Sequence, residues 1–235
     1  MRWVGLVALL VGCSSAPAPA PVEPAPIVEP VSQADDYLVI ERSLGTPGPE
    51  VPTVFGFHGR GDRADSFAGI LRGWSGPARV RFVQAPHPYG AGWSWYDVSV
   101  RDGDSAGLAR QILEQAEQIA GWLEKQGGPP PTVFGFSQGG MLSWALAVHH
   151  PEVVGKAISL GGWLPPEAWP ERAGEAVAPL YVLHGEADPV VPVGPTQQAA
   201  QAMVERGFPV EVTVYPGVVH TVNRAMHERL VGLLE

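Results

Sequence analysis

The sequence predicts an α/β fold with a mostly parallel central sheet and helices on both faces. From residue 37 onward, short β-rich runs alternate with helical patterns, which is how chains build parallel sheets. Two of the runs are spelled PTVFGF and are apolar throughout, as in strands that are buried on both faces. We therefore expect one domain over residues 35–235, without a separate cap domain.

The strands and helices of this domain follow from local composition. Runs rich in β-branched and aromatic residues predict strands at 37–40, 53–57, 80–83, 132–136, 156–160, 180–183 and 210–215. Apolar residues at helical spacing predict helices at 105–125, 141–149, 195–206 and 222–234. The first of these helices carries four apolar residues on one face, which are Leu108, Ile112, Ile119 and Leu123.

The two PTVFGF runs, at 52–57 and 131–136, continue into different loops, HGRG and SQGG. The residues beyond the runs do not match and no third copy follows, so an internal repeat does not explain them. Ligands of open α/β sheets bind beyond the carboxyl ends of the strands. We therefore expect both loops to face one site.

The N-terminal segment has the pattern of an export signal. Residues 1–12 contain one arginine, an apolar stretch too short to span a bilayer, and small residues. The segment ends in LVGC, which resembles a bacterial lipobox, and its cysteine, Cys13, is the only one in the chain. We expect cleavage before Cys13, lipidation of its thiol, and a Pro/Ala-rich semi-rigid tether over 13–34. This predicts a lipid-anchored protein of the bacterial cell envelope.

Composition argues against two other classes of partner. The formal net charge is -9, and the 15 Lys and Arg residues are scattered, so the chain lacks a nucleic-acid-binding footprint. No HExxH motif occurs, and Cys13 is assigned to lipidation, so a metal site is not favoured. We expect no metal and no organic cofactor.

The GFSQG sequence at 135–139 fits the G-x-S-x-G pattern. In this pattern a strained turn between a strand and a helix exposes the serine hydroxyl, and only glycine flanks avoid a clash. The motif alone is weak in a glycine-rich chain, but here an apolar strand precedes it and an apolar helix follows. We therefore predict that Ser137 is a nucleophile.

A serine hydroxyl needs a base, and the base needs an acid partner to orient it. In the order that this pattern requires, Asp188 follows the 180–183 strand and His220 follows the 210–215 strand. Glu186 is the rival acid, and His184 at the strand end is expected to be structural. The other histidines considered lack a matching context, and they are His87, His149, His150 and His227.

Several motifs together resemble those of one family. GFSQGG, HGEADPVVP and PGVVH, with FHGRGD upstream, are similar to segments of the phospholipase/carboxylesterase family of α/β-hydrolases, as are WSWYD at 93–97 and SLGGWLP at 159–165. The resemblance extends from about Val51 to the C-terminus and implies an α/β-hydrolase fold in which the two PTVFGF strands are neighbours. It also implies an oxyanion hole made by the backbone N–H groups of Arg60 and Gln138.

The side chain of Arg60 departs from the family pattern, because such enzymes more often carry an apolar residue there. We hypothesise that it favours substrates with a nearby anionic group. Aromatic side chains on the loops after the 80–83 and 156–160 strands are candidates for an acyl pocket, although ordinary core packing explains them equally well. They are Trp93, Trp95, Tyr96, Trp163 and Trp169.

The leading hypothesis is a membrane-tethered serine esterase that resembles carboxylesterases and lysophospholipases. It would hydrolyse esters of small or single-chain acyl groups, including lipid esters, through an acyl-enzyme. Thioesterase, polyester or feruloyl-type esterase and peptidase activities remain open. A different class also remains: a hydrolase-fold lipoprotein that binds ligands or acts as a scaffold without turnover.

Lipidation of Cys13 leads to a direct prediction. Each buried CH₂ of an acyl chain contributes about 0.8 kcal/mol to membrane binding, so two or three chains hold a protein on the membrane. Mass spectrometry of the membrane fraction should therefore find an acylated terminus at Cys13. An unmodified terminus at Met1 would contradict the prediction.

Overall fold

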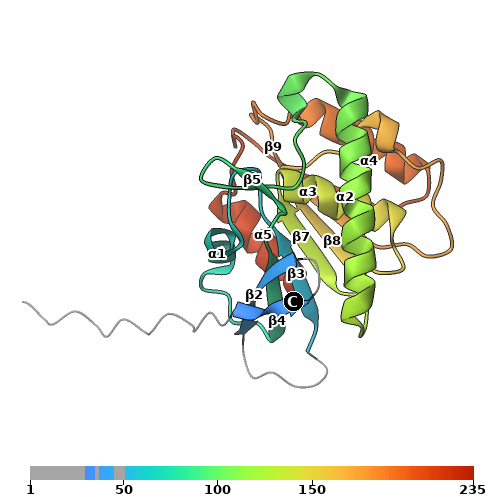
Figure 1. Cartoon of the computed structure of the whole chain (residues 1–235). Coiled ribbons are helices and arrows are strands. Elements are labelled where there is room, and N and C mark those ends of the chain that lie inside the picture. Colours follow the sequence, from blue (N-terminus) through green and yellow to red (C-terminus); the bar gives the residue numbers. More distant parts are fainter. Residues whose placement is uncertain (1–29, 35–36, 45–50) are drawn as a thin grey trace, which may run out of the picture.

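The computed structural model describes residues 30–34, 37–44 and 51–235 (Figure 1). The predicted signal segment 1–12, the lipidation site Cys13 and most of the tether lie outside the described residues. Within these ranges, no helix combines the length and the apolar character needed to cross a membrane.

An eight-stranded sheet forms the centre of the described domain, and its spatial order is β1-β2-β4-β3-β7-β8-β9-β10. In this spatial order, all neighbours from β4 to β10 are parallel. At the other edge, β2 is antiparallel to β4, and β1 is antiparallel to β2. The strands are β1 (Pro30–Ala34), β2 (Tyr37–Leu44), β3 (Thr53–Phe57), β4 (Ala78–Val83), β7 (Thr132–Phe136), β8 (Lys156–Leu160), β9 (Leu180–Gly185) and β10 (Val210–Tyr215). This arrangement confirms the mostly parallel sheet, and β3 and β7, the two PTVFGF strands, are hydrogen-bonded neighbours.

Helices cover both faces of the sheet, which confirms the expected layers (Figure 1). One face packs against α2, α3 and α4, and the other packs against α1 and α5. The helices are α1 (Ala64–Phe67), α2 (Ser105–Gln126), α3 (Gln138–His149), α4 (Val193–Glu205) and α5 (Arg224–Leu234).

Successive residues of each central strand point to opposite layers, as the pleat of a strand requires. In β3, Phe55 packs with the α2 and α3 layer, whereas Val54 packs with the α1 and α5 layer. In β7, Val133 and Phe134 divide in the same way, and both side chains are fully buried. Burial of such a side chain contributes about 1.5–3 kcal/mol, which explains why these strands are apolar at every position.

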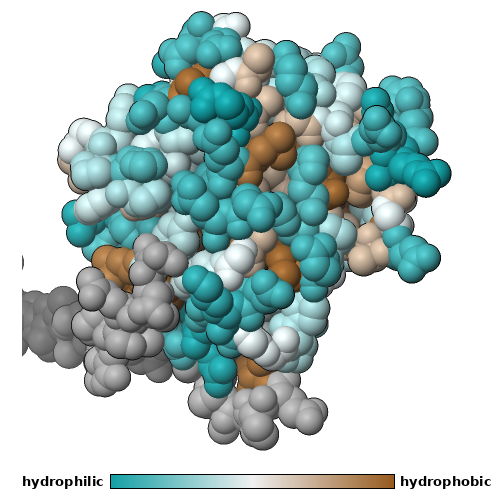
Figure 2. Space-filling view, turned by 45° about the vertical axis from the view of Figure 1, so that its right-hand side comes forward, coloured by the Kyte–Doolittle hydropathy of each residue, from teal (hydrophilic) through white to brown (hydrophobic). Residues whose placement is uncertain are grey.

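The long helix α2 is amphipathic as predicted. Its expected apolar face, Leu108, Ile112, Ile119 and Leu123, is at most 4% exposed. Charged residues such as Arg110 and Glu114 lie on the outer side, where they form an i,i+4 ion pair of 3.4 Å. Figure 2 shows a mostly hydrophilic molecular face on which apolar residues form small separate patches.

Several elements differ from the sequence-based expectation. Residues 30–34, which we expected in the tether, form edge strand β1 on β2, because an unpaired strand edge accepts any extended backbone. Pro30 begins this strand, a position that proline tolerates. Short elements were also missed: the β5 (His87–Tyr89) and β6 (Gly92–Ser94) hairpin, and the 3-10 helices η1 (Ala68–Leu71), η2 (Val100–Asp102) and η3 (Pro166–Ala168). Among the described residues, the segments between β4 and α2 and between β8 and β9 hold only such small elements rather than a cap domain.

The β7–α3 turn is packed directly against the end of β3. A Cβ atom placed on Gly139 would lie 2.0 Å from the carbonyl oxygen of Phe57, and one on Gly135 would lie 2.3 Å from the backbone of Gly139. Only glycine permits such an approach of two backbones. The two loops that follow the PTVFGF strands are therefore held together by glycine packing.

This packing predicts opposite effects for two glycine-to-alanine substitutions. Gly139→Ala should lower the free energy of unfolding by at least about 1–3 kcal/mol, because the methyl group overlaps a backbone carbonyl. Gly121→Ala, in α2 with open space around the glycine, should raise it by about 0.5–1 kcal/mol. Urea unfolding of both variants measures the difference, and equal changes would contradict the proposed overlap.

Candidate active site

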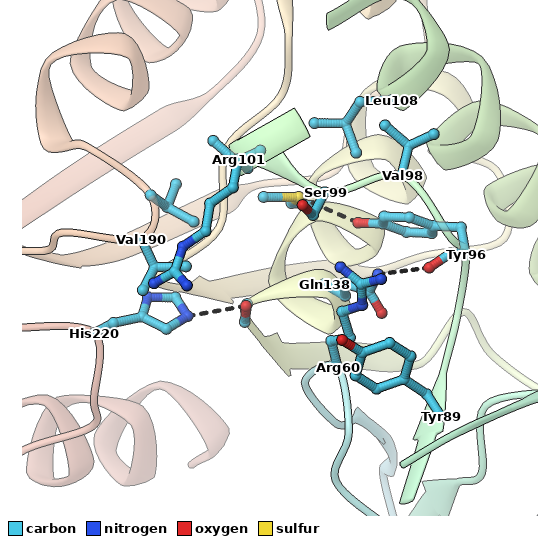
Figure 3. Close-up of a pocket in the computed structure, with 14 residues that line it drawn as sticks. Arg60, Tyr89, Tyr96, Val98, Ser99, Arg101, Leu108, Gln138, Val190 and His220 are labelled. Atoms are coloured by element: carbon cyan, nitrogen blue, oxygen red, sulfur yellow. Dashed lines mark hydrogen bonds between the residues drawn. The ribbon is translucent and has the colours of Figure 1, made fainter. Parts of the chain in front are cut away.

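Three predicted side chains meet beyond the carboxyl ends of β7, β9 and β10. The Nε2 atom of His220 lies 2.9 Å from Oγ of Ser137, and its Nδ1 atom lies 2.6 Å from Oδ2 of Asp188. In this geometry Nδ1–H donates to the carboxylate, which leaves Nε2 to accept the serine proton. Figure 3 shows His220 at one side of the cavity, with a dashed line for a hydrogen bond of its ring.

The backbone of Ser137 is strained. Its φ of 55° and ψ of -115° make it the only non-glycine residue with positive φ in the part of the chain that the structure describes. Its N–H donates to the carbonyl of Leu160 on the neighbouring strand at 2.9 Å. Such strain costs about 1–3 kcal/mol, and here the turn presents the hydroxyl to the cavity.

Asp188 is fixed by its own loop. Its Oδ1 atom accepts hydrogen bonds from the backbone N–H groups of Val190 at 2.8 Å and Val191 at 2.9 Å. These bonds leave Oδ2 to orient His220. The rival acid, Glu186, is exposed and accepts instead from the N–H of Gly217 at 3.1 Å, so the structure does not bring it to His220.

His184 lies behind Asp188 and is fully buried. Its Nε2–H donates to the carbonyl of Val191 at 2.8 Å, and Nε2 is 3.6 Å from Oδ2 of Asp188. Burial lowers the pKa of His184 more than its hydrogen bond and the nearby carboxylate raise it, so the ring is neutral. His184 therefore braces the loop that carries the acid, in keeping with the structural role predicted for it.

The resemblance assigns the oxyanion hole to the backbone N–H groups of Arg60 and Gln138, and within residues 51–235 both groups lack a protein acceptor. Gln138 is the first residue of α3, where N–H groups have no partner in the helix. The loop before Arg60 touches the serine, because a Cβ atom on Gly59 would lie 3.4 Å from Cβ of Ser137. The two unpaired donors therefore belong to residues on the two loops that meet at the serine.

His58 positions the Arg60 loop, a role that was not predicted from the sequence. Its Nδ1 atom bonds the carbonyl of Gly59 at 2.7 Å, while Nε2 accepts from the N–H of Ala85 at 3.1 Å and contacts Nε2 of Gln84 at 2.9 Å. Burial lowers the pKa of His58, so the ring stays neutral. The available signal was a polar residue directly after a buried strand.

The side chain of Gln138 connects the serine turn to the 94–96 segment. Its Oε1 atom accepts from Oγ–H of Ser94 at 3.0 Å and from the N–H of Trp95 at 3.1 Å. Its Nε2–H donates to the carbonyl of Tyr96 at 2.9 Å. All three partners are buried, so one amide fixes both sides of the site.

A cavity of about 300 Å³ opens beside Ser137. Trp93, Trp95 and Trp163 do not line it, so their assignment to a substrate pocket is wrong. Trp95 is instead fully buried and donates from Nε1 to the carbonyl of His58 at 2.8 Å. Trp93 and Trp163 are partly buried and pack against the same core, and Trp169, also outside the lining, donates from Nε1 to the carbonyl of Leu164.

The cavity wall combines apolar and cationic side chains. Of the predicted aromatic residues only Tyr96 lines it. The apolar lining consists of Val98, Val100, Leu108, Met141, Val190 and Val191, and the cationic lining consists of Arg60 and Arg101. Within the described ranges, no group of three or more His, Cys, Asp and Glu side chains is arranged to bind a metal ion.

Comparison with solved structures places this arrangement in a known fold. The esterase PE8 superimposes with a TM-score of 0.73 at 20% identity over 85% of this chain and 98% of that one. SOBER1 of Arabidopsis thaliana superimposes with a TM-score of 0.64 at 22% identity over 78% and 97% of the two chains. Both likenesses establish the α/β-hydrolase fold.

Sequence comparison extends this result to the family. Acyl-protein thioesterase 1 of Neurospora crassa is 28% identical over 196 residues, which cover 72% of this chain and 80% of that one. The profile of a family described as Phospholipase/Carboxylesterase matches residues 45–232, which include every residue of the site. The match covers most of the chain, and the protein therefore belongs to the phospholipase/carboxylesterase family.

Proposed function

We propose that this serine hydrolase cleaves carboxylic esters of small or single-chain acyl groups through an acyl-enzyme on Ser137. The observation that carries the proposal is the hydrogen-bonded series from Asp188 through His220 to Ser137, which opens on a cavity. Ester hydrolysis agrees with the family, whose members compared above include an acyl-protein thioesterase. No residue outside this series is needed as base or nucleophile.

In the first half of the reaction, Oγ of Ser137 attacks the ester carbonyl while its proton moves to Nε2 of His220. The C–O bond to the alcohol then breaks, and Nε2 gives that proton to the departing oxygen. In the second half, a water molecule attacks the acyl-enzyme and loses a proton to Nε2. Protonation of the serine oxygen releases the acid and restores the starting state. Asp188 stabilises the imidazolium in both halves.

Negative charge that develops on the carbonyl oxygen would be met by the N–H groups of Arg60 and Gln138. Both N–H groups are held in place before substrate binds. The hydrogen bonds of His58 hold the Arg60 loop, and those of the side-chain amide of Gln138 hold the serine turn. Preorganised donors of this kind contribute about 2.7–4 kcal/mol each to the transition state.

The size of the cavity supports a small or single-chain acyl group. A volume of about 300 Å³ is at the lower end of the range for ligand pockets. Apolar side chains such as Leu108 and Met141 offer an acyl chain dispersion contacts.

The sequence of residues 1–34 supports, in addition, a lipid anchor at Cys13 and a place in the bacterial cell envelope.

The nucleophile can be tested with p-nitrophenyl esters of increasing acyl length, using residues 30–235 so that β1 is kept. Turnover should fall by about 10⁴-fold or more in Ser137→Ala, because the attacking oxygen is lost. A fluorophosphonate probe should label Ser137, as read by peptide mass spectrometry. A folded protein that neither turns over nor labels would overturn the proposal and favour a binding module.

The identity of the acid can be tested with a matched pair of neutral substitutions. Asp188→Asn should lower kcat by about 10³–10⁴-fold, because an amide cannot stabilise the imidazolium or fix its tautomer. Glu186→Gln, two residues away and outside the hydrogen-bonded series, should change kcat by less than about threefold. If the larger loss occurred in Glu186→Gln, the assignment of the acid would be wrong.

A further inference from the structure

We infer that the preferred ester carries an anionic group next to the scissile bond, and that the guanidinium groups of Arg101 and Arg60 bind it. The inference rests on the proposed esterase function and specifies its substrate class. Both arginines line the cavity that contains Ser137 and His220. In Figure 3, Arg101 extends toward His220, while Arg60 lies beside Tyr89 at the opposite side.

Arg60 is a positioned cation. Its Nη2–H donates to the backbone carbonyl of Asp97 at 2.9 Å, and its guanidinium lies 4.2 Å from the centre of the Tyr89 ring. Its Nε atom is buried without a hydrogen-bond partner within the described residues. These contacts hold the guanidinium at the cavity wall without using a carboxylate, so its charge is not neutralised by an ion pair.

Arg101 is the more available of the two. It is exposed, and no Asp or Glu among the described residues lies within ion-pair distance of its guanidinium. Some exposed arginines elsewhere in the described part of the domain are paired, for example Arg110 with Glu114, and others, such as Arg172, are not, so what distinguishes Arg101 is its place in the cavity wall. An unpaired guanidinium in the wall of an active-site cavity is a ready partner for a substrate anion.

Acidic residues near the cavity do not cancel this charge. No Asp or Glu is among the side chains that line it. Asp102, next to Arg101, accepts a hydrogen bond from the N–H of Ser99 at 2.6 Å. Hydrogen bonds from Ser99 chiefly lower the pKa of Asp102, and the charge of Arg60 adds a smaller effect, so Asp102 offsets part of the Arg60 charge. Arg101 is the main contact because it is exposed in the cavity wall and has no ion-pair partner among the described residues.

The contrast with the whole chain strengthens the inference. The formal net charge is -9, and an acidic surface repels anionic substrates over distances of about a Debye length, roughly 10 Å at 0.1 M salt. Two cations line the cavity and, among the described residues, no carboxylate does, since Asp188 is buried behind His220, and the low-dielectric walls focus this positive field. The cavity therefore selects an ester that bears its own negative charge.

Two substrate pairs separate an anion in the acyl part from one in the alcohol part. The first pair is p-nitrophenyl valerate and mono-p-nitrophenyl glutarate, which have equal acyl length. The second pair is phenyl valerate and its meta-carboxyphenyl analogue. For each pair, kcat/KM of the acidic ester is divided by kcat/KM of the neutral ester. Comparing this ratio between variant and wild type removes the difference in intrinsic reactivity between the two esters.

In at least one pair, Arg101→Gln should lower the ratio by about threefold or more, and Arg101→Glu should lower it further. The wild-type ratio in that pair should also fall as NaCl is raised. Arg110→Gln is the control, because Arg110 is an exposed arginine on α2 that lies outside the cavity, and it should leave the ratio unchanged. Competition by glutarate or by inorganic phosphate against the neutral ester then distinguishes a carboxylate from a phosphate as the bound anion.

The outcomes separate the two proposals. If neutral esters are hydrolysed but neither ratio responds to Arg101→Gln or to salt, the anion site is overturned and the esterase function stands. Arg60→Leu tests the second cation, and unchanged ratios in both arginine variants would exclude both guanidinium groups as the anion site. If no ester is hydrolysed at all, the esterase function fails and the inference fails with it.

Discussion

The site depends on one close contact between backbones, in which the start of α3 lies against the end of β3. Gly139 has space for no Cβ atom beside the carbonyl of Phe57, and this approach brings the Arg60 loop to the serine turn. A parallel pairing of β3 with β7 makes the contact possible, since both strands end at the same edge. The glycines at this point therefore determine where the nucleophile and the two free N–H donors can stand relative to one another.

The histidines around the site divide into structural and chemical ones according to their burial. His58 and His184 are buried, and burial lowers the pKa of each, so they act as fixed neutral hydrogen-bonding groups at the two sides of the site. His220 is only partly buried and lies against the ring of Phe136, with centroids 4.8 Å apart. It keeps one nitrogen toward the carboxylate and the other toward the serine, which is the arrangement that a proton carrier requires.

Sequence reasoning succeeded where function follows from position along the chain. Ser137 comes directly after an apolar run, and Asp188 and His220 lie in the loops that follow two others, so a correct set of strands was enough to predict that they meet. It failed for Trp93, Trp95 and Trp163, because which face of a loop turns inward depends on packing from distant elements; Trp95 is covered by Tyr37 and Phe57. Edge strand β1 was missed for a related reason, since backbone pairing at a sheet edge leaves little trace in composition.

The way the chain enters the domain has a mechanical consequence. β1 is the outermost strand, and β2, β4 and β3 stand between it and the serine-bearing β7. Tension applied to the chain before residue 30 reaches β1 first, and it can peel this strand from β2 while the parallel strands stay paired. Under load the N-terminal edge therefore unfolds first, and the central strand β7 keeps its pairing with β3 and β8.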